Sequence, residues 1–165
     1  MQCLITSHWP HPDINPDPVP WFIYLKAETP LGQSVRPGDR VLFYRTADFR
    51  IDGKPVKSVQ QVSGPQSETV ALRTGPGGIV GAASVVRTIE AVPTGQPRFI
   101  YDPERDFGYQ IRCTEPLARS RRIVPYAEML SILGESPKKP AFAFGLYRIK
   151  DASACRSLMD AAGLP

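Results

Sequence analysis

Four residues with flat aromatic or imidazole rings could hold a nucleic-acid base. A base taken out of its stack needs rings to lie against and donors or acceptors along its edge. His8 and Trp9 begin a proline-rich segment, and Trp21 follows the end of that segment. Tyr44 stands in a strongly apolar stretch. We predict a base-binding pocket, between the loop of residues 8–20 and the stretch around Tyr44, with walls from these four residues.

Arginines form a second group of candidates, because a guanidinium group can give a phosphate two parallel hydrogen bonds. The chain carries 20 Lys and Arg against 16 Asp and Glu, a net charge of +4, which weakly favours a polyanionic partner. The densest basic run covers residues 119–122, where a solvated surface turn is the alternative interpretation. The predicted contacts to a nucleic-acid backbone are Arg45, Arg50, Arg119, Arg121 and Arg122.

Metal and cofactor chemistry is not predicted from this sequence. His8 and His11 are spaced like ligands on a helix face, with Asp13 and Cys3 nearby, but the intervening prolines prevent a helix. The sequence contains no Gly-x-Ser-x-Gly, no phosphate-binding loop with its lysine, and no His-Glu-x-x-His. We therefore predict no catalytic residue, no metal site and no cofactor.

Two segments carry the strongest strand signals, residues 41–46 and 79–88. Alternation along the first would place Val41 and Phe43 on one face and Leu42 and Tyr44 on the other. The glycine-rich residues 74–78 before the second are predicted to form a hairpin turn. Further strands are expected over residues 2–7, 60–73, 99–101, 109–113 and 141–147, and residues 21–27 fit either a strand or a helix.

Helices are predicted near the end of the sequence, over residues 125–133 and 152–162. Gly134 and Gly163 would end them, and Asp151 would cap the second. No linker or repeat divides the 165 residues, so a single domain spanning 1–165 is expected. The predicted fold class is α+β, a mixed or antiparallel sheet curled into a small β-barrel with flanking helices.

Location in the cell is inferred from what the sequence lacks. No apolar run approaches the roughly 20 residues that cross a bilayer, and the first residues do not resemble a signal peptide. No membrane partner is therefore expected, and a cytoplasmic location is predicted. The three cysteines, Cys3, Cys113 and Cys155, are far apart and odd in number, so they are interpreted as buried reduced thiols.

Two of these segments together resemble the EVE domains of the PUA-like superfamily. Residues 37–46 (PGDRVLFYRT) resemble the x-G-D-x-V-x-F-Y strand of these domains, and residues 78–86 (GIVGAASVV) are similar to their G-I-V-G-x-x-x-V strand. Residues 145–163 are similar to the strand and helix that end such domains. Residues 21–35 depart from the family, because they do not match its Trp/Arg/Asn-containing segment.

The resemblance implies a PUA-like barrel and a non-catalytic reader of DNA or RNA. EVE and YTH domains hold a modified base in a pocket with aromatic walls. The related ASCH domains bind RNA or hydrolyse small modified nucleosides, and on that alternative Lys26, Glu28 and Thr46 would be the candidates. A protein-interaction module is the third hypothesis.

Overall fold

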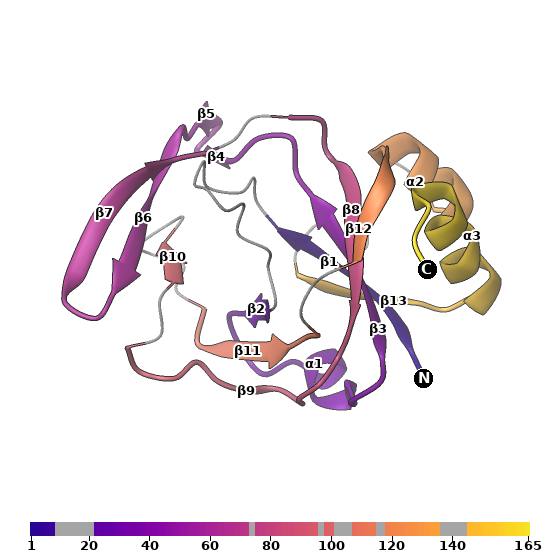
Figure 1. Ribbon diagram of the computed structural model, residues 1–165, viewed down its shortest axis with the longest axis horizontal. Coiled ribbons are helices and arrows are strands. Elements are labelled where there is room, and N and C mark those ends of the chain that lie inside the picture. The colour runs from indigo at the N-terminus through magenta and orange to yellow at the C-terminus, as the bar shows by residue number, and fades with distance from the viewer. Residues whose placement is uncertain (9–21, 73–74, 96–97, 101–106, 115–117, 136–144) are drawn as a thin grey trace.

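The computed structural model places two helices on one side of a large sheet, with smaller sheets on the other (Figure 1). Burial of apolar side chains between these layers is what holds them together. The structure describes residues 1–8, 22–72, 75–95, 98–100, 107–114, 118–135 and 145–165. An α+β fold with a mixed sheet is confirmed for this part of the chain.

The large sheet has five strands, which are β1 (Cys3–His8), β3 (Arg40–Arg45), β8 (Gly78–Ser84), β12 (Ala118–Val124) and β13 (Leu146–Ile149). Their order across the sheet is β12-β8-β3-β1-β13. Strands β1 and β3 run parallel, and the other neighbours run antiparallel. The predicted strand at residues 41–46 is β3, and the one at residues 79–88 is β8, which ends four residues earlier than expected.

Helices α2 (Tyr126–Leu133) and α3 (Ala152–Ala162) cover one face of this sheet. The Asp151 carboxylate accepts the backbone N–H of Ser153 at 2.8 Å and so caps α3, as predicted. Ile5, Leu42, Ile79, Met129 and Leu158 are among the buried side chains beneath these helices. The longest helix of the described residues has 11 residues, and none of these helices is long and apolar enough to cross a membrane.

A small sheet of β2 (Phe22–Leu25), β11 (Tyr109–Arg112) and β9 (Glu90–Ala91) packs on the opposite face. Val41 and Phe43 face this second core, whereas Leu42 and Tyr44 face the helices. The alternation predicted for β3 is therefore confirmed. A short helix that the sequence did not suggest, α1 (Pro30–Ser34), begins where the Thr29 hydroxyl accepts the Gly32 N–H at 3.0 Å.

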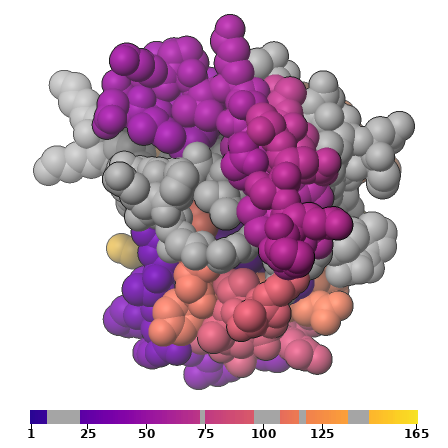
Figure 2. All heavy atoms as spheres, turned by 90° about the vertical axis from the view of Figure 1, so that its left-hand side faces the viewer, coloured from indigo at the N-terminus to yellow at the C-terminus, as the bar shows by residue number. Residues whose placement is uncertain are grey.

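The third sheet is dominated by a hairpin of β6 (Ser58–Ser63) and β7 (Gln66–Ala71), with β10 (Arg98–Ile100) on the other side of β6. The hairpin lies at the outer limit of the molecule, on the same side as the small sheet (Figure 2). Only Val59 and Val70 are buried within its two long strands. A two-stranded ladder of β4 (Arg50–Ile51) and β5 (Lys54–Pro55) precedes it.

The link between β7 and β8 corrects one prediction. These strands belong to different sheets and do not pair with each other, so glycine-rich residues 75–78 are not part of the predicted hairpin turn. The last of these residues, Gly78, has φ of +155°, and a Cβ there would lie 2.4 Å from the carbonyl oxygen of Val124. A glycine is needed because the backbones of β8 and β12 approach closely there.

The cysteine prediction is wrong for two of the three residues. Cys3 on β1 and Cys155 on α3 form a disulfide with a Cα–Cα distance of 6.3 Å, and only Cys113 is a buried thiol. Packing of α3 on the sheet brings together residues 152 positions apart, which their spacing could not reveal. Structural disulfides are rare in reducing compartments, so this disulfide gives no support to a cytoplasmic location. That location stays a prediction.

Candidate functional site

The four residues of the predicted aromatic pocket are only partly placed by the structure. Trp9 and Trp21 lie outside the described residues. His8 ends β1 and pairs with Arg45 on β3. Tyr44 points to the helix side of the sheet, where its ring lies 6.1 Å from that of Tyr126, edge to face. Burial, reinforced by Tyr126, raises the pKa of Tyr44 above its ordinary value.

Two of the predicted phosphate-binding arginines are held by neighbouring loops. The Nη2 of Arg45 donates to the carbonyl oxygen of Pro76 at 3.1 Å. The Nε of Arg50 lies 2.9 Å from Asp48 Oδ2, and its Nη1 donates to the Gly53 carbonyl at 3.2 Å. A phosphate contact at Arg50 would therefore compete with a carboxylate.

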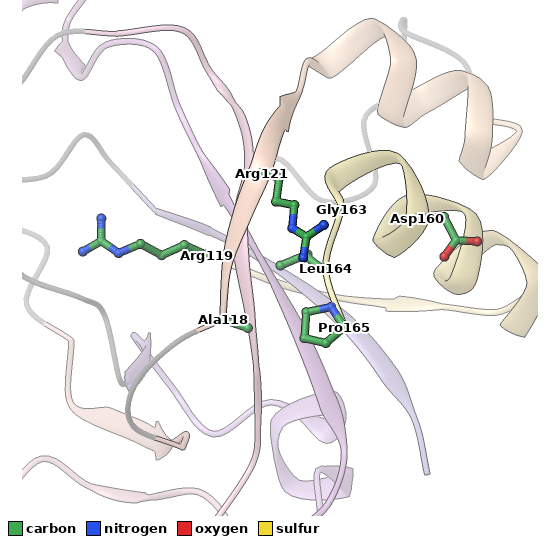
Figure 3. Close-up of a pocket in the computed structure, with 7 residues that line it drawn as sticks. All are labelled: Ala118, Arg119, Arg121, Asp160, Gly163, Leu164 and Pro165. Carbon is green, nitrogen blue, oxygen red and sulfur yellow. The ribbon is translucent and has the colours of Figure 1, made fainter.

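The basic run at residues 119–122 lies in β12, one of the two edge strands of the large sheet, and not in a surface turn. The pairing of β12 with β8 is irregular between Arg119 and Val124. Figure 3 shows Arg119 and Arg121 extending to opposite sides of the strand, although residues two apart share a face in a regular strand. These two arginines are exposed but do not converge on one phosphate-sized site.

A shallow recess lies beside Arg121, between β12 and the end of α3 (Figure 3). Its volume is about 480 Å³, and the residues around it include Asp160, Gly163, Leu164 and Pro165. A Cβ at Gly163 would lie 3.0 Å from Cβ of Arg121, so the arginine stem packs on the end of the helix. Arg121 contributes a guanidinium group to this recess and Asp160 contributes a carboxylate.

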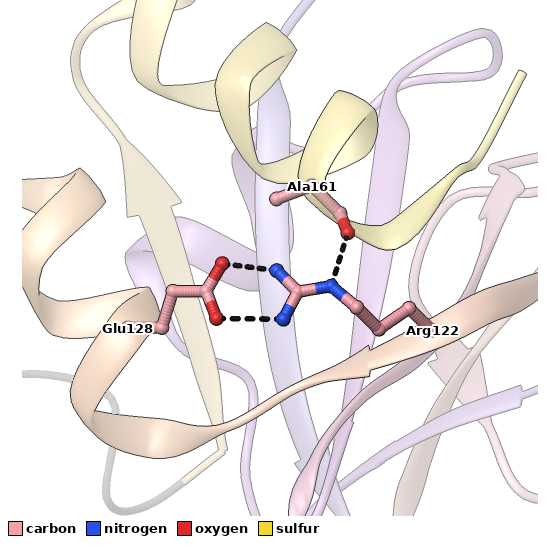
Figure 4. Close-up of polar contacts among 3 residues, drawn as sticks. All are labelled: Arg122, Glu128 and Ala161. Atoms are coloured by element: carbon pink, nitrogen blue, oxygen red, sulfur yellow. Dashed lines mark hydrogen bonds and ion pairs between the residues drawn. The ribbon is translucent and has the colours of Figure 1, made fainter.

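The third arginine of the run, Arg122, joins β12 to both helices (Figure 4). Its two Nη atoms pair with the two carboxylate oxygens of Glu128, and its Nε donates to the Ala161 carbonyl at 3.1 Å. The hydrogen bond from Arg122 lowers the pKa of Glu128, and the same bond raises the pKa of Arg122. This side chain therefore positions helices, and a phosphate would have to displace Glu128.

The small sheet carries an aromatic face that the sequence reasoning missed. Ile23 and Ile111 turn into the core, so their strand neighbours Phe22, Tyr24 and Gln110 turn away from it. The Tyr24 ring lies 5.9 Å from that of Phe22 and 6.4 Å from that of Phe107. All three rings are half-buried. We use the term aromatic face for Phe22, Tyr24, Phe107, Gln110 and Glu90.

Polar groups lie beside these rings. Gln110 is only 1% exposed, and its Nε2 donates to Glu90 Oε1 at 2.9 Å. The other Glu90 oxygen lies 3.9 Å from Nη1 of Arg87, and about a third of the Glu90 side chain is exposed. Aromatic rings can lie against the flat face of a base, and a neighbouring carboxylate can accept hydrogen bonds from its edge. A glutamine beside Ile111 in a predicted strand was the signal available in the sequence.

The residues of the hydrolase alternative lie near two strand ends. Lys26 and Glu28 are exposed after β2, and Glu28 accepts a hydrogen bond from Gln33 Nε2 at 3.1 Å. Thr46 follows β3, and its buried hydroxyl has no hydrogen-bond partner among the described residues. The described part of the chain contains no group of three or more His, Cys, Asp and Glu side chains arranged to hold a metal ion.

Comparisons with known proteins indicate the fold but not the function. No protein-family model and no curated protein matches the sequence. A hypothetical protein from Leishmania major is similar in structure, with a TM-score of 0.52 and 12% identity over 99% of this chain and 95% of that one. A protein from Pseudomonas syringae has a TM-score of 0.51 and 9% identity, over 97% and 99% of the two chains. At such identities the likeness concerns the fold alone.

Proposed function

We propose that the protein binds DNA or RNA without catalysing a reaction, holding one base, modified in its natural target, against the aromatic face. The observation that carries this proposal is the juxtaposition of Tyr24, Phe107 and the Gln110–Glu90 pair on one side of the small sheet. Stacking on aromatic side chains stabilises an unstacked base by about 1–3 kcal/mol. The partly exposed Glu90 carboxylate supplies an acceptor for its edge, and the buried Gln110 amide holds that carboxylate in place.

The charge distribution supports a polyanionic partner. Of the five arginines predicted to contact a backbone, Arg119 and Arg121 are exposed on β12, an edge strand of the large sheet. We propose that these two contact phosphates. The EVE-like strands β3 and β8 support the finer assignment of a PUA-like barrel, which likewise belongs to this proposal.

Direct binding measurements test the proposal. Fluorescence anisotropy with labelled single- and double-stranded DNA and RNA, each with and without modified bases, would identify the substrate class. We expect Tyr24→Leu to weaken binding of the preferred ligand at least tenfold, since leucine keeps apolar volume but removes the ring. The binding constant should also fall with rising salt, because phosphate contacts release counterions.

Tyr126→Leu is the matched control, because Tyr126 is also half-buried and also packs against another aromatic ring, Tyr44. The control should bind normally if the base lies on the aromatic face. A loss with Tyr126→Leu and none with Tyr24→Leu would move the pocket to the Tyr44 side. The absence of salt-dependent binding to every ligand would overturn the proposal.

A further inference from the structure

Strand β12 is an edge of the large sheet, and β7 is an edge of the hairpin sheet. The two edges differ in how they are protected from pairing with another strand. Edge strands expose unpaired backbone groups, and natural proteins blunt them with charges, proline or bulges. Strand β12 has three arginines and an irregular register. Strand β7 (QSETVA) has neither proline nor irregular pairing over its six residues, and Glu68 is its only charge. Among the described residues, the outer edge of β7 has no strand beside it.

The pairing register identifies which backbone groups point outward. Ser63 faces Gln66 across the turn of the hairpin, and the ladder continues unbroken to Ser58 and Ala71. Beyond its end, the N–H of Leu72 donates to the carbonyl of Lys57 at 2.8 Å. Even-numbered residues of β7 therefore bond to β6, since antiparallel ladders alternate. The N–H and C=O groups of Ser67, Thr69 and Ala71 point to the free edge, and these residues are exposed.

The side chains keep this edge extended. The Nε2 of Gln60 on β6 donates to the Thr69 hydroxyl at 2.8 Å, and the Ser67 hydroxyl donates to Gln60 Oε1 at 2.9 Å. One glutamine thus fixes two hydroxyls on the outer face of the hairpin. An edge already held in strand geometry loses little conformational entropy when it pairs.

We propose that β7 is a dimerisation edge, which pairs antiparallel with β7 of a second copy of this chain. A two-fold axis perpendicular to the sheet requires one residue to face its own copy. The two central residues of β7 are Glu68 and Thr69. With Glu68 at the axis, two like charges would be opposed, which destabilises a strand pair.

With Thr69 at the axis, no charges oppose each other. Ser67 then faces Ala71 of the second copy, Glu68 faces Val70, and the two threonines form a favourable β-branched pair. The outward groups of Ser67, Thr69 and Ala71 supply the new ladder, so the two hairpins join into one continuous sheet. The self-complementary register is the reason for choosing a second copy as the occupant.

A cysteine pair tests this register. The Cα atoms of residue 69 in the two copies would lie about 5.5 Å apart, which a disulfide can bridge. Thr69→Cys should therefore give a covalent dimer under mild oxidation, seen as a doubled mass on a non-reducing gel. Ser67→Cys is the matched control, because its two copies would be displaced by about 13 Å along the strands. Wild-type protein with its own three cysteines gives the background.

Light scattering and sedimentation test the assembly itself. The wild type should form particles of two 18.2 kDa chains at a concentration on the order of 100 µM, because so short an edge contact is at the weak end of interfaces. Thr69→Pro removes the central outward N–H and should give monomers. Thr69→Val loses the bond to Gln60 but keeps the strand, and should remain dimeric. A wild type that is monomeric at this concentration, or equal crosslinking by the two cysteine variants, would overturn the proposal.

Discussion

The helix-covered side of the large sheet and the β6–β7 hairpin are stabilised in different ways. Beneath the helices, Met129, Leu158 and Ala162 are fully buried, and a disulfide joins β1 to α3. In the hairpin only Val59 and Val70 are buried, and hydroxyl and amide side chains bond to one another on the outer face. Burial holds the first region and backbone pairing holds the second. The rigid region can therefore serve as a scaffold while the hairpin remains available to a partner.

Loss of the disulfide on the helix-covered side is expected to have the largest effect on the free energy of unfolding. Closing a loop across 152 residues reduces the entropy of the unfolded chain, which stabilises the fold by about 4–5 kcal/mol. Cys155→Ala should lower the free energy of unfolding in urea by that order. A reductant should lower the unfolding free energy of the wild type to about that of the variant, and it should leave the unfolding free energy of the variant unchanged. An unfolding curve of the wild type that does not respond to reductant would mean that the bond contributes nothing.

Deleting core volume is the next effect in size. Leu158 is fully buried between α3 and the sheet, so Leu158→Ala should cost about 2–5 kcal/mol of unfolding free energy. Ser157→Ala is the matched control on the exposed side of the same helix, and a change within about 0.5 kcal/mol is expected. Denaturation in urea, followed by circular dichroism, measures both. A small loss of unfolding free energy in Leu158→Ala would contradict the view that buried apolar side chains stabilise the helix-covered side of the sheet.

The hairpin should respond less to the same kind of change. Val70 is 7% exposed and lies outside both hydrophobic core clusters, so Val70→Ala should cost roughly 1 kcal/mol of unfolding free energy. The substitution leaves the backbone ladder with Val59 in place. If Val70→Ala lost as much stability as Leu158→Ala, the two regions would not differ as we describe. Global unfolding in urea is again the measurement.

Local patterns predicted the helix-covered side well. Helix α3 begins and ends where Asp151 and Gly163 were expected to place it, because both ends are specified by capping residues within the helix's own sequence. The faces of β3 followed from alternation alone. Neither signal depends on distant residues, which is why a single sequence was sufficient.

Features built from distant segments were not predictable in this way. The aromatic face joins Tyr24 to Phe107 and Gln110, which only strand pairing brings together. The disulfide depends on the docking of α3 on β1. The β12 arginines also show the limit of local reasoning, since a run of charge fits a turn as well as an edge strand. The predicted roles of Trp9 and Trp21 remain predictions, because both lie outside the described residues.

The smallest expected effect concerns the ion pair that connects β12 to α2. Arg122 lowers the pKa of Glu128 from 4.5, so the pair stabilises the fold at pH values above 4.5 and this contribution is lost as the pH falls through the lowered pKa. Glu128→Gln should therefore be less stable than the wild type at neutral pH, and the difference should disappear in acid. Glu68→Gln on the exposed hairpin is the matched control, because Glu68 makes no ion pair within the described residues. Unfolding curves at a series of pH values check this, and a Glu128→Gln difference that persisted below the lowered pKa would show that its cause is not the ion pair.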